Sequence, residues 1–560
     1  MKICIAQQNY IIGNISGNLQ KILQAVNQAK SAGAEMIVFS EMAVCGYPPK
    51  DFLEFQPFLQ KCFDAIETLA AASKDIAIIV GAPAINPKPE GKSLFNAAYF
   101  LAEGKVQQVI HKALLPTYDI FDEYRYFEPG FDFHCITWKG LKIAVTICED
   151  IWDMEADPIY RFRPMDLLIK ENPAFMVNLS ASPFDYFHAE KRAFIIGANA
   201  TTYQLPVMYC NTVGAQTEII FDGGSTICNA DKKIVTQLPC FEEAFSFVMW
   251  TGQGFEAVKE NEVAISLPDV PPDTSIYQES VHIDLIHQAL VMGIREYFVK
   301  TGCQQAIVAS SGGIDSAVTL ALAVEALGKE KVRALLLPSQ FSTDHSVSDA
   351  VQLSQNLDNK YDIISIKEIF ETVHRSLQPV FGELPFDVTE ENIQSRIRGL
   401  LVMALANKYQ CVLLNTSNKS ELATGYGTLY GDMAGGLSVL GDLYKTQVYA
   451  LARHINRNSI IIPENIIHKA PSAELRPGQK DSDSLPDYSF LDKVLYQFIE
   501  ERKSTDEILA LGWDEAQVKR TIAMLHRNEF KRHQFCPILR VSSKAFGSGR
   551  RMPIVSKYEF

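Results

Sequence analysis

The first half of the chain alternates short apolar runs with one segment of clear helical periodicity. Buried strands are predicted where four or five apolar residues follow one another, at residues 3–6, 36–39, 76–80, 143–147 and 175–179. An amphipathic helix is predicted where apolar residues recur every three or four positions, at Leu19, Ile22, Leu23 and Val26. Because strand signals outnumber helix signals, this half favours a layered α/β domain rich in sheet.

The pattern breaks at a proline-rich stretch and then resumes in a different order. Residues 266–280 contain Pro268, Pro271 and Pro272 with little periodicity, and are interpreted as a linker between domains 1–265 and 281–560. After the linker, a helix (283–298), a strand (306–309), a helix (316–327) and a strand (332–337) are predicted. This order is typical of a doubly wound parallel sheet. A second stretch rich in Pro, Asp and Ser, residues 471–486, is interpreted as a mobile loop.

Bulk composition narrows the class of protein. A chain of 560 residues is too long for one hydrophobic core, so at least two domains are expected. The net charge of -14 argues against a nucleic-acid partner, because phosphate binding usually requires a basic excess. The 11 cysteines include no CxxC pair, and the N-terminal sequence has no signal-peptide layout. Scattered reduced thiols fit a cytosolic compartment, so a cytoplasmic protein is expected, and no apolar run is long enough to span a membrane.

Cys148 stands at the end of a predicted strand, where a thiol would face a crevice. Taken alone, a buried core cysteine is the favoured interpretation. Two other segments change that balance: Glu41 also follows a predicted strand, and Lys112 precedes the sequence Ala-Leu-Leu-Pro-Thr-Tyr. A thiolate attacks an amide carbon, a carboxylate with a raised pKa moves protons, and a fixed ammonium stabilises an oxyanion. The three residue types therefore suit cleavage of an amide.

These segments, in this order, resemble the Glu-Lys-Cys triad of the nitrilase (carbon-nitrogen hydrolase) superfamily over about residues 1–260. The resemblance implies an α-β-β-α sandwich. It also implies that Glu41 is the base, Lys112 the oxyanion stabiliser and Cys148 the nucleophile, with Glu123 as an additional glutamate that orients the triad.

The amide substrate implied by this resemblance is that of L-glutamine. Tyr118 and Ser182 match positions that line the glutamine pocket of related synthetases. His188 stands where a lysine is expected, so it is interpreted either as a glutamine contact or as a surface histidine. Arg192 lies four residues later on the same helical face and is interpreted either as a partner of the glutamine carboxylate or as an ordinary helix charge.

The second constellation is the loop Ser310-Ser311-Gly312-Gly313-Ile314-Asp315-Ser316, between a predicted strand and a predicted helix. Glycines let backbone N–H groups approach a phosphate, and a helix N-terminus favours an anion. By itself a Ser/Gly turn that caps a helix is an equally good interpretation. No Gly-Lys-Ser/Thr follows, so the loop is not a Walker A sequence.

The loop resembles that of the N-type ATP pyrophosphatases, which release AMP and pyrophosphate. Three further segments extend the resemblance to the NAD synthetase family over about residues 280–540: residues 392–399, 412–421 and 430–446. The first of these was expected to open an amphipathic helix with Ile393, Ile397, Leu400, Leu401 and Ala404 on its apolar side. A Rossmann-like, doubly wound parallel sheet of the adenine nucleotide alpha-hydrolase type is implied.

Residue roles follow from this resemblance position by position. ATP contacts are implied for Ala309, Ser310, Ser311, Gly312, Gly313, Ile314, Asp315, Ser316, Thr416 and Lys445, with Ser472 as a weaker match. Deamido-NAD contacts are implied for Asn392, Glu421 and Lys531. Asp315 and Glu421 match the carboxylates that hold Mg2+. Position 429 is Leu where ammonia-using relatives carry a substrate-binding lysine.

Together the two resemblances imply ATP-dependent amidation of deamido-NAD with ammonia freed from glutamine, by a homo-oligomer with small-molecule substrates and no membrane or nucleic-acid partner. Three alternatives stay open. Another amidotransferase on the same ATP loop would make a different amide. A binding protein with inactive sites would have no turnover. A hydrolase with an unrelated appended domain would work without ATP.

Overall fold

The structure is a computed structural model that describes residues 1–154, 158–258 and 266–557. Its backbone divides into two compact units: Met1–Gln216 with Ile220–Pro272, and Thr217–Ile219 with Asp273–Phe560. The chain passes from one unit to the other between Pro272 and Asp273, within residues 266–280. The end of the predicted first domain, residues 259–265, lies outside the described residues. No helix in the described ranges is long and apolar enough to cross a membrane.

Two mixed sheets form the centre of the first unit. The seven-stranded sheet has the order β15-β14-β1-β2-β3-β4-β5. Its strands are β1 (Lys2–Gln7), β2 (Met36–Val38), β3 (Ala77–Ile85), β4 (Leu94–Ala102), β5 (Lys105–His111), β14 (Ala244–Trp250) and β15 (Phe255–Ala257). The six-stranded sheet has the order β13-β12-β9-β8-β7-β6. Its strands are β6 (Ile136–Trp138), β7 (Leu141–Ile147), β8 (Phe175–Ser180), β9 (Val207–Asn211), β12 (Thr226–Cys228) and β13 (Ile234–Gln237).

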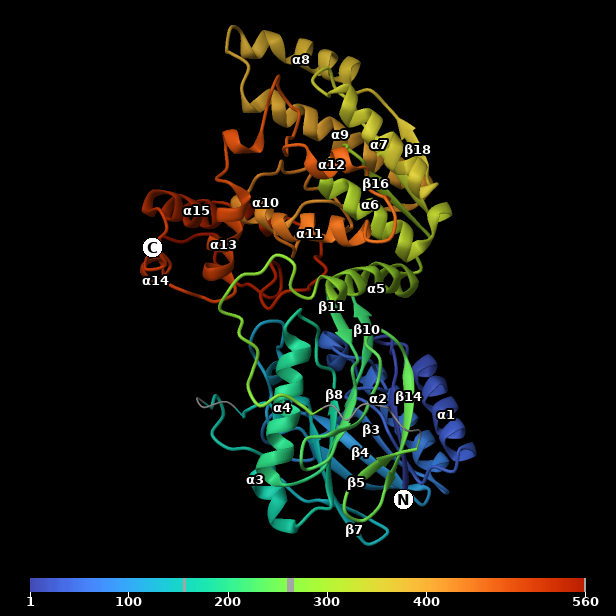
Figure 1. Ribbon diagram of the computed structural model, residues 1–560. Coiled ribbons are helices and arrows are strands. Elements are labelled where there is room, and N and C mark those ends of the chain that lie inside the picture. The colour runs from blue at the N-terminus through green and yellow to red at the C-terminus, as the bar shows by residue number, and fades with distance from the viewer. Residues whose placement is uncertain (155–157, 259–265, 558–560) are drawn as a thin grey trace. The chain divides into compact units, whose positions relative to one another are not determined.

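Among the described residues of this unit, the α-helices and a separate strand pair complete the fold. The helices are α1 (Ile15–Ser31), α2 (Gln56–Ala72), α3 (Met165–Leu168) and α4 (His188–Tyr203), and the pair is β10 (Val213–Gln216) with β11 (Ile219–Asp222). Figure 1 shows α1 and α4 on opposite outer sides of the two sheets. The predicted α-β-β-α sandwich is therefore confirmed.

The burial pattern explains why these strands read as continuous apolar runs. Val145 and Val177 point into the core between the two sheets, whereas their neighbours Ala144 and Met176 pack in the layer that contains α4. Both faces of each central strand are thus covered, and alternation of polar and apolar residues disappears. All five predicted strands are present as β1, β2, β3, β7 and β8, with shifts of a few residues at their ends.

The second unit is built on one parallel sheet with the order β18-β17-β16-β19-β20. Its strands are β16 (Gln305–Ala309), β17 (Val332–Leu336), β18 (Lys360–Ile363), β19 (Cys411–Asn415) and β20 (Leu437–Ser438). Because β16 has β17 on one side and β19 on the other, the strand order reverses beside it. Ligands of doubly wound sheets bind at such a point, at the carboxyl ends of the strands.

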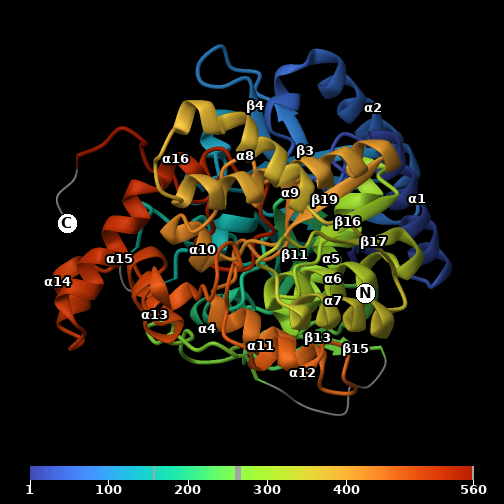
Figure 2. The ribbon, with the colours of Figure 1, turned by 90° about the horizontal axis from the view of Figure 1, so that it is seen from above.

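Helices cover both faces of this sheet. They are α5 (Ile283–Thr301), α6 (Ile314–Leu327), α7 (Asp344–Leu357), α8 (Lys367–Phe381), α9 (Val388–Tyr409), α10 (Lys419–Thr424), α11 (Lys445–Ile455) and α12 (Glu464–His468). The chain ends in a helical group made of α13 (Tyr488–Ile499), α14 (Thr505–Leu509), α15 (Glu515–Arg527) and α16 (Glu529–Arg532). Figure 2 shows α13, α14 and α15 together at one side of this unit, away from α7 and β17. The predicted doubly wound sheet is confirmed.

Two details of the predicted second domain are wrong. Helix α9 begins at Val388, before Asn392, because Asp387 and Glu390 form a capping box at its N-terminus. Leu400, expected on the apolar side of this helix, is 64% exposed. The side that packs on the sheet instead contains Ile397, Val402 and Ala406.

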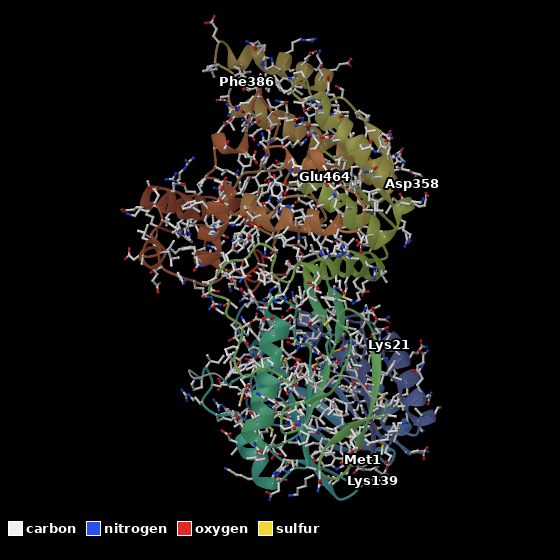
Figure 3. The ribbon with its side chains drawn as sticks, in the orientation of Figure 1. Met1, Lys21, Lys139, Asp358, Phe386 and Glu464 are labelled. Carbon is white, nitrogen blue, oxygen red and sulfur yellow. The ribbon has the colours of Figure 1, made fainter. Side chains whose placement is uncertain are left out.

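Charged side chains mostly lie on the outside of each unit, as Lys139 and Asp358 do in Figure 3. A small number of charged residues are instead fully buried, among them Glu41, Lys112 and Lys419. Ionised groups are rarely buried unless they are paired or functional. The buried charged residues are therefore candidates for functional sites.

Candidate active sites

Cys148 lies directly after β7, at the start of a 3-10 turn that spans Cys148–Ile151. Its side chain is buried, and its φ of 43° lies in the left-handed region. A non-glycine residue rarely adopts that conformation, and when it does it often belongs to a functional site.

Lys112 connects two of the predicted carboxylates. Its Nζ lies 2.8 Å from Glu41 Oε1 and 2.8 Å from Glu123 Oε1, and all three side chains are buried. Glu41 follows β2, Lys112 follows β5 and Glu123 begins a 3-10 turn. Carboxylates from 71 residues before Lys112 and from 11 residues after it therefore meet at one ammonium group.

Neighbouring groups fix both carboxylates. Glu41 accepts hydrogen bonds from Asn96 Nδ2 (2.6 Å) and from the backbone N–H of Ala181 (3.0 Å). The hydroxyl of Tyr47 donates to Glu123 at 2.8 Å. Gly81 lets the Glu41 segment lie against β3, since a Cβ there would stand 2.3 Å from the backbone nitrogen of Met42. The cluster is thus held rigid without a ligand.

The charges in this cluster affect one another. Burial alone would lower the pKa of Lys112, but Glu123 and Glu41 raise it well above its ordinary value, so the side chain stays an ammonium. Burial, reinforced by Glu41, raises the pKa of Cys148, and Lys112 opposes the rise. The thiol is therefore protonated at neutral pH and close enough to both charges to respond to them. Its proton must leave when the sulfur attacks, which requires a base.

Glu149 is a residue of this site that the sequence did not reveal. Its buried carboxylate accepts hydrogen bonds from the hydroxyls of Tyr118 (2.9 Å) and Tyr160 (3.0 Å). Burial raises the pKa of Glu149 to about 7. Its position immediately after Cys148 was a usable signal, but the two tyrosines come from other segments. The ring of Tyr118 is 44% exposed although its hydroxyl is bonded, so it lies at the edge of the site.

Ser182 and His188 contact each other, beyond the end of β8. The distance from Ser182 Oγ to His188 Nε2 is 2.7 Å, and His188 Nδ1 lies 3.5 Å from Asp185 Oδ2. The ring of His188 also stacks on Trp152, with 4.7 Å between centroids. The side chain of His188 is thus 17% exposed and has named partners, which fits either a glutamine contact or a satisfied surface histidine.

Arg192 does not have the glutamine role that was considered for it. Its guanidinium is buried and forms two hydrogen bonds to Asp222, at 2.9 and 2.5 Å. A bidentate pair of this kind is already satisfied. The other interpretation, an ordinary helix charge, does not describe the ion pair with Asp222, because that pair is internal.

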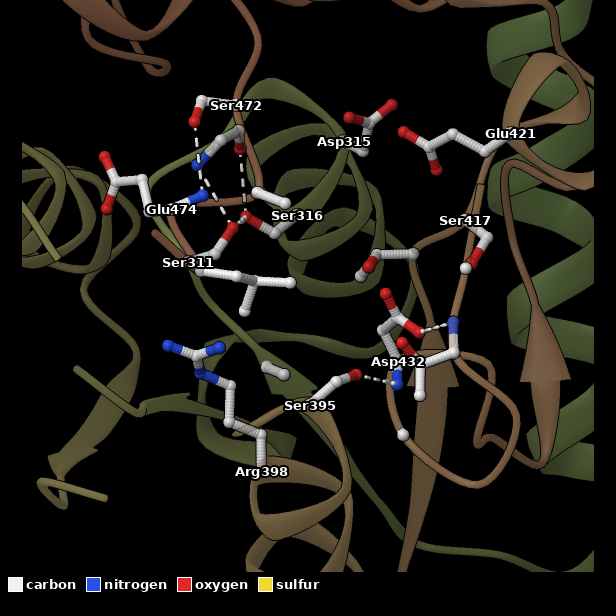
Figure 4. A pocket seen from close by; sticks show the side chains of 18 of the residues that line it. Ser311, Asp315, Ser316, Ser395, Arg398, Ser417, Glu421, Asp432, Ser472 and Glu474 are labelled. Atoms are coloured by element: carbon white, nitrogen blue, oxygen red, sulfur yellow. Dashed lines mark hydrogen bonds between the residues drawn. The ribbon is translucent and has the colours of Figure 1, made fainter. Parts of the chain in front are cut away.

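In the second unit, the loop Ser310–Ser316 connects β16 to α6. Gly312 has φ of 78°, and a Cβ there would stand 2.2 Å from the backbone oxygen of Ser346, so a larger residue does not fit. The loop borders a cavity of about 460 Å³. Figure 4 shows Ser311 and Ser316 on one wall of it, with Asp315 and Glu421 near each other on another. All the predicted ATP and deamido-NAD residues except Gly312 line this cavity.

A lysine between carboxylates recurs here. Lys445 Nζ lies 2.5 Å from Asp315 Oδ2 and 3.6 Å from Glu421 Oε1. Burial and the neighbouring Asp315 raise the pKa of Glu421 to about 8, while Lys445 opposes that rise. Asp481, from the predicted mobile loop, faces the same group and accepts hydrogen bonds from Tyr488 (3.0 Å) and Tyr426 (3.2 Å). Sequence reasoning missed Asp481.

The remaining predicted contacts lie around the same cavity. Asn392 accepts a hydrogen bond from Thr428 Oγ1 at 2.7 Å, and Lys531 Nζ donates to the carbonyls of Gly425 (2.7 Å) and Gly427 (2.8 Å). At position 429, where a lysine was missing, the leucine carbonyl accepts a hydrogen bond from Arg396. Arg396, on α9, therefore places a cation beside position 429.

The donor groups in this cavity fit Mg2+. Asp315 and Glu421 offer hard oxygen ligands. The two carboxylates repel each other and share only Lys445 as a neighbouring cation, so a second cation would stabilise the pair. Magnesium sites commonly use one or two carboxylates and complete the shell with substrate phosphates and water. No cluster of three or more His, Cys, Asp or Glu side chains with metal-binding geometry occurs among the described residues.

Comparisons with known proteins agree with both folds. Residues 2–250 match the family model for carbon-nitrogen hydrolase, and residues 286–535 match the model for NAD synthase. The glutamine-dependent NAD(+) synthetase of Synechocystis sp. is 42% identical over 563 residues, with 99% of each chain covered. That of Thermotoga maritima is 36% identical over 586 residues, covering 100% of this chain and 99% of its own.

A solved structure is similar over the whole chain. It is that of the glutamine-dependent NAD+ synthetase from Acinetobacter baumannii in complex with ADP, with a TM-score of 0.76, 36% identity and coverage of 99% of this chain and 98% of that one. The two folds and the two matched models define the class, a carbon-nitrogen hydrolase domain and an NAD synthase domain in a single chain. The chain belongs to the glutamine-dependent NAD(+) synthetase family.

Proposed function

We propose that this protein converts deamido-NAD to NAD, using ATP and ammonia released from L-glutamine, with L-glutamate, AMP and pyrophosphate as the other products. One observation carries the proposal. A buried thiol beside a glutamate–lysine pair and a cavity lined by the SSGGIDS loop occur in the same chain. The first arrangement suits release of ammonia from an amide, and the second suits activation of a carboxylate by ATP.

The thiol half begins with attack of Cys148 Sγ on the side-chain amide carbon of glutamine. Glu41 takes the thiol proton as the C–S bond forms and gives it to the departing nitrogen as the C–N bond breaks. Because the thiol is protonated at rest, this transfer belongs to the attack itself. Lys112 stabilises the negative oxygen of each tetrahedral intermediate. Glu41 then takes a proton from water as the water oxygen attacks the thioester carbon, the C–S bond breaks, the proton returns to the sulfur of Cys148, and glutamate leaves.

Recognition of glutamine follows from the charges around Cys148. The α-ammonium group of glutamine needs a buried anion, and Glu149 supplies one beside the nucleophile. The α-carboxylate needs donors, which Ser182 and His188 offer, while Tyr118 orients Glu149 by donating its hydroxyl proton to that carboxylate. A substrate that lacks the ammonium would leave Glu149 unpaired, so simple amides are expected to be poor substrates.

In the synthetase half, a carboxylate oxygen of deamido-NAD attacks the α-phosphorus of ATP, and pyrophosphate leaves. The product is an acyl adenylate, a mixed anhydride with a good leaving group. Ammonia attacks its carbonyl carbon, the C–O bond breaks, and AMP departs. Lys445 and the backbone N–H groups of the loop at Ser310–Ser316 hold the phosphates. Bound to Asp315 and Glu421, Mg2+ would supply neutralising charge for those phosphates.

The substrate contacts of deamido-NAD are proposed for Asn392, Glu421 and Lys531. Burial lowers the pKa of Lys531, the neighbouring Asp432 opposes the change, and the ammonium donates to two backbone carbonyls. It is therefore suited to an anionic substrate group. A cytoplasmic homo-oligomer is part of the proposal and would be checked by light scattering of the purified protein.

The deciding experiment incubates the purified protein with deamido-NAD, ATP, Mg2+ and glutamine, and separates the products by chromatography. We expect NAD, AMP, pyrophosphate and glutamate to form in equal amounts. Formation of ADP in place of AMP, or of an amide other than NAD when further acceptors are offered, would reject this assignment. Glutamate formation that is unaffected by omission of ATP and deamido-NAD, without any NAD in the complete mixture, would favour the hydrolase with an unrelated second domain.

A further inference from the structure

Asp150 is a buried carboxylate with no role in the steps of the proposed reaction. The residue is 5% exposed and lies two positions after Cys148. Three backbone N–H groups donate to its side chain. Those of Ala113 (3.0 Å) and Leu114 (2.9 Å) donate to Oδ1, and that of Ile147 (2.9 Å) donates to Oδ2. The side chain therefore holds the path of the main chain at two places.

These donors belong to two different sheets of the first unit. The first two directly follow Lys112, which comes after β5 of the seven-stranded sheet. The third is the last residue of β7 in the six-stranded sheet, immediately before Cys148. The Asp150 side chain thus connects the segment that carries the ammonium group with the segment that carries the thiol.

Other contacts fix each of these segments on its own sheet. The backbone N–H of Lys112 donates to the carbonyl of Asn96 on β4 at 2.8 Å. The side-chain amide of Asn178 on β8 donates to the carbonyl of Cys148 at 3.5 Å. Each contact lies on one side of the sandwich, whereas the carboxylate of Asp150 crosses from one sheet to the other.

The ionised form of Asp150 is the one that makes these contacts. Burial raises its pKa to about 6, while the hydrogen bonds from Leu114 and Ile147 and the charge of Lys112 oppose the rise. At neutral pH both oxygens are therefore acceptors, and hydrogen bonds to a carboxylate are stronger than those between neutral groups. A neutral amide in its place would turn one acceptor into a donor that faces another N–H group.

From this arrangement we infer that Asp150 is a positioning residue that holds Lys112 and Cys148 at the separation that amide cleavage requires. The negative oxygen of the tetrahedral intermediate forms on the carbon that the sulfur attacks, so the distance between thiol and ammonium decides how well that oxygen is stabilised. In this role Asp150 acts through the main chain and does not touch the substrate. The inference rests on the proposed function, because it takes Cys148 as the nucleophile and Lys112 as the oxyanion stabiliser.

The test measures glutamate release from glutamine by wild type, Asp150→Asn and Asp150→Glu, with kcat and KM determined separately. Asp150→Glu keeps the charge but moves the carboxylate by one methylene. We expect both variants to lower kcat by about 10-fold to 100-fold, the cost of a small misplacement of reacting groups. The KM for glutamine should change by less than about 3-fold, since an interaction that acts in the transition state does not strengthen substrate binding.

Asp153→Asn is the matched control. Asp153 is a second buried aspartate, three positions after Asp150, and its Oδ1 accepts a hydrogen bond from the backbone N–H of Ile159 at 3.0 Å. This variant also alters an acceptor of a main-chain hydrogen bond, but not one that involves the Lys112 segment. Its kcat should stay near that of wild type.

A double-mutant cycle shows whether Asp150 acts through Lys112. In the Lys112→Met background there is no ammonium group to position, so adding Asp150→Asn should lower the remaining kcat by less than about 3-fold. A second loss as large as that seen in wild type would overturn the inference in favour of a role that is independent of Lys112.

The other outcomes are equally decisive. Unchanged kcat in both Asp150 variants, or a wild-type kcat in Asp150→Glu, would overturn the inference and leave the proposed function intact. A raised KM at unchanged kcat would overturn it in favour of substrate binding. Equal losses of kcat in Asp150→Asn and Asp153→Asn would overturn it in favour of a general disturbance of this region. Failure of wild type to release glutamate would overturn the proposed function as well. If Asp150→Asn does not fold, as judged by urea unfolding, Asp150→Glu decides the same question.

Discussion

Each unit contains a lysine held between two carboxylates, and the two clusters differ in what they leave open. Lys112 is 2.8 Å from both Glu41 and Glu123, and all three side chains are at most 4% exposed. Lys445 is 2.5 Å from Asp315 but 3.6 Å from Glu421, and those carboxylates are 16% and 17% exposed. The first cluster is closed and symmetrical, whereas the second faces a cavity.

The difference matches the chemistry proposed for each cluster. Amide cleavage at Cys148 needs a base and a cation that are already in position. A closed cluster supplies both without rearrangement when the substrate binds. Transfer of AMP needs charges that meet a metal and phosphates, so the second cluster keeps carboxylate oxygens accessible. In this proposal, a lysine with two carboxylates supplies catalytic groups in one unit and a ligand-binding set in the other.

Removing the central lysine of the closed cluster should have the largest effect. Lys112→Met would leave Glu41 and Glu123 buried without their cation, which typically costs about 3–5 kcal/mol of stability. Loss of the oxyanion stabiliser should also lower glutamine turnover by about 100-fold to 1000-fold. Three of the four tryptophans, Trp138, Trp152 and Trp250, lie in the first unit, so urea unfolding followed by tryptophan fluorescence reports mainly on that unit.

The control for that prediction is Lys139→Met, which removes an exposed lysine of the same unit that pairs with Glu35. Surface pairs contribute about 0–1 kcal/mol, so this variant should unfold close to wild type. Equal stabilities of the two variants would contradict the description of Lys112 as the centre of a closed cluster.

The open cluster should respond mainly in ligand binding. Glu421→Gln removes one proposed Mg2+ ligand, so NAD synthesis with either glutamine or ammonia should fall by about 100-fold, in the range seen when one strong electrostatic contact is lost. Addition of Mg2+ and ATP should raise the melting temperature of wild type and leave that of Glu421→Gln nearly unchanged, because binding to the folded state alone stabilises it. A full thermal shift in the variant would remove Glu421 from the metal site.

Glu149 gives a pH-dependent prediction of intermediate size. Its pKa is raised from 4.5 to about 7 in the folded protein, so folding favours the protonated acid. The stabilisation is complete below pH 4.5 and is lost as the pH rises towards 7, by roughly 2–3 kcal/mol. Glu149→Gln cannot ionise, so its loss of stability between pH 5 and 8 should be smaller than that of wild type by about this amount.

Function should change in the opposite direction in the same variant. Pairing with the α-ammonium of glutamine requires the carboxylate form, so the KM of wild type for glutamine should fall as the pH rises through about 7. Glu149→Gln should have a high KM without that dependence. Identical pH dependences of stability and of KM in the two proteins would show that Glu149 does not ionise in this range or does not meet the substrate.

His188 should produce the smallest change. It contacts Ser182 but lies outside the Glu41–Lys112 cluster, so His188→Ala should raise the KM for glutamine by roughly 3-fold to 10-fold, the loss of about one hydrogen bond. The kcat should stay near that of wild type, and His188→Lys should restore part of the affinity. A fall in kcat at unchanged KM would instead make His188 a participant in the chemistry.

The sequence predicted much of this description, because its strongest signals are local. Apolar runs located the central strands, and the residues after them, Glu41 and Cys148, were expected to face a crevice. The sequence also contains the capping-box residues Asp387 and Glu390, which would have predicted the start of α9 correctly. These features depend on neighbours within a few positions.

What escaped prediction depends on partners that only the fold brings together. Glu149 matters through Tyr118, 31 residues away, and Arg192 is neutralised by Asp222, 30 residues away. The exposure of Leu400 could not be read from helical periodicity, since other residues of α9 cover the sheet. Asp481 faces the open cluster from a segment whose composition indicated only a loop.

The central claim is that the two clusters serve separate steps of one reaction, and Cys148→Ala tests it most directly. NAD formation by this variant would be measured with glutamine and, in parallel, with ammonium chloride as the nitrogen source. We expect synthesis from glutamine to disappear and synthesis from ammonium to continue at close to the wild-type rate. Synthesis from glutamine at the wild-type rate, or loss of synthesis from both sources in a folded variant, would contradict the division of labour between the two units.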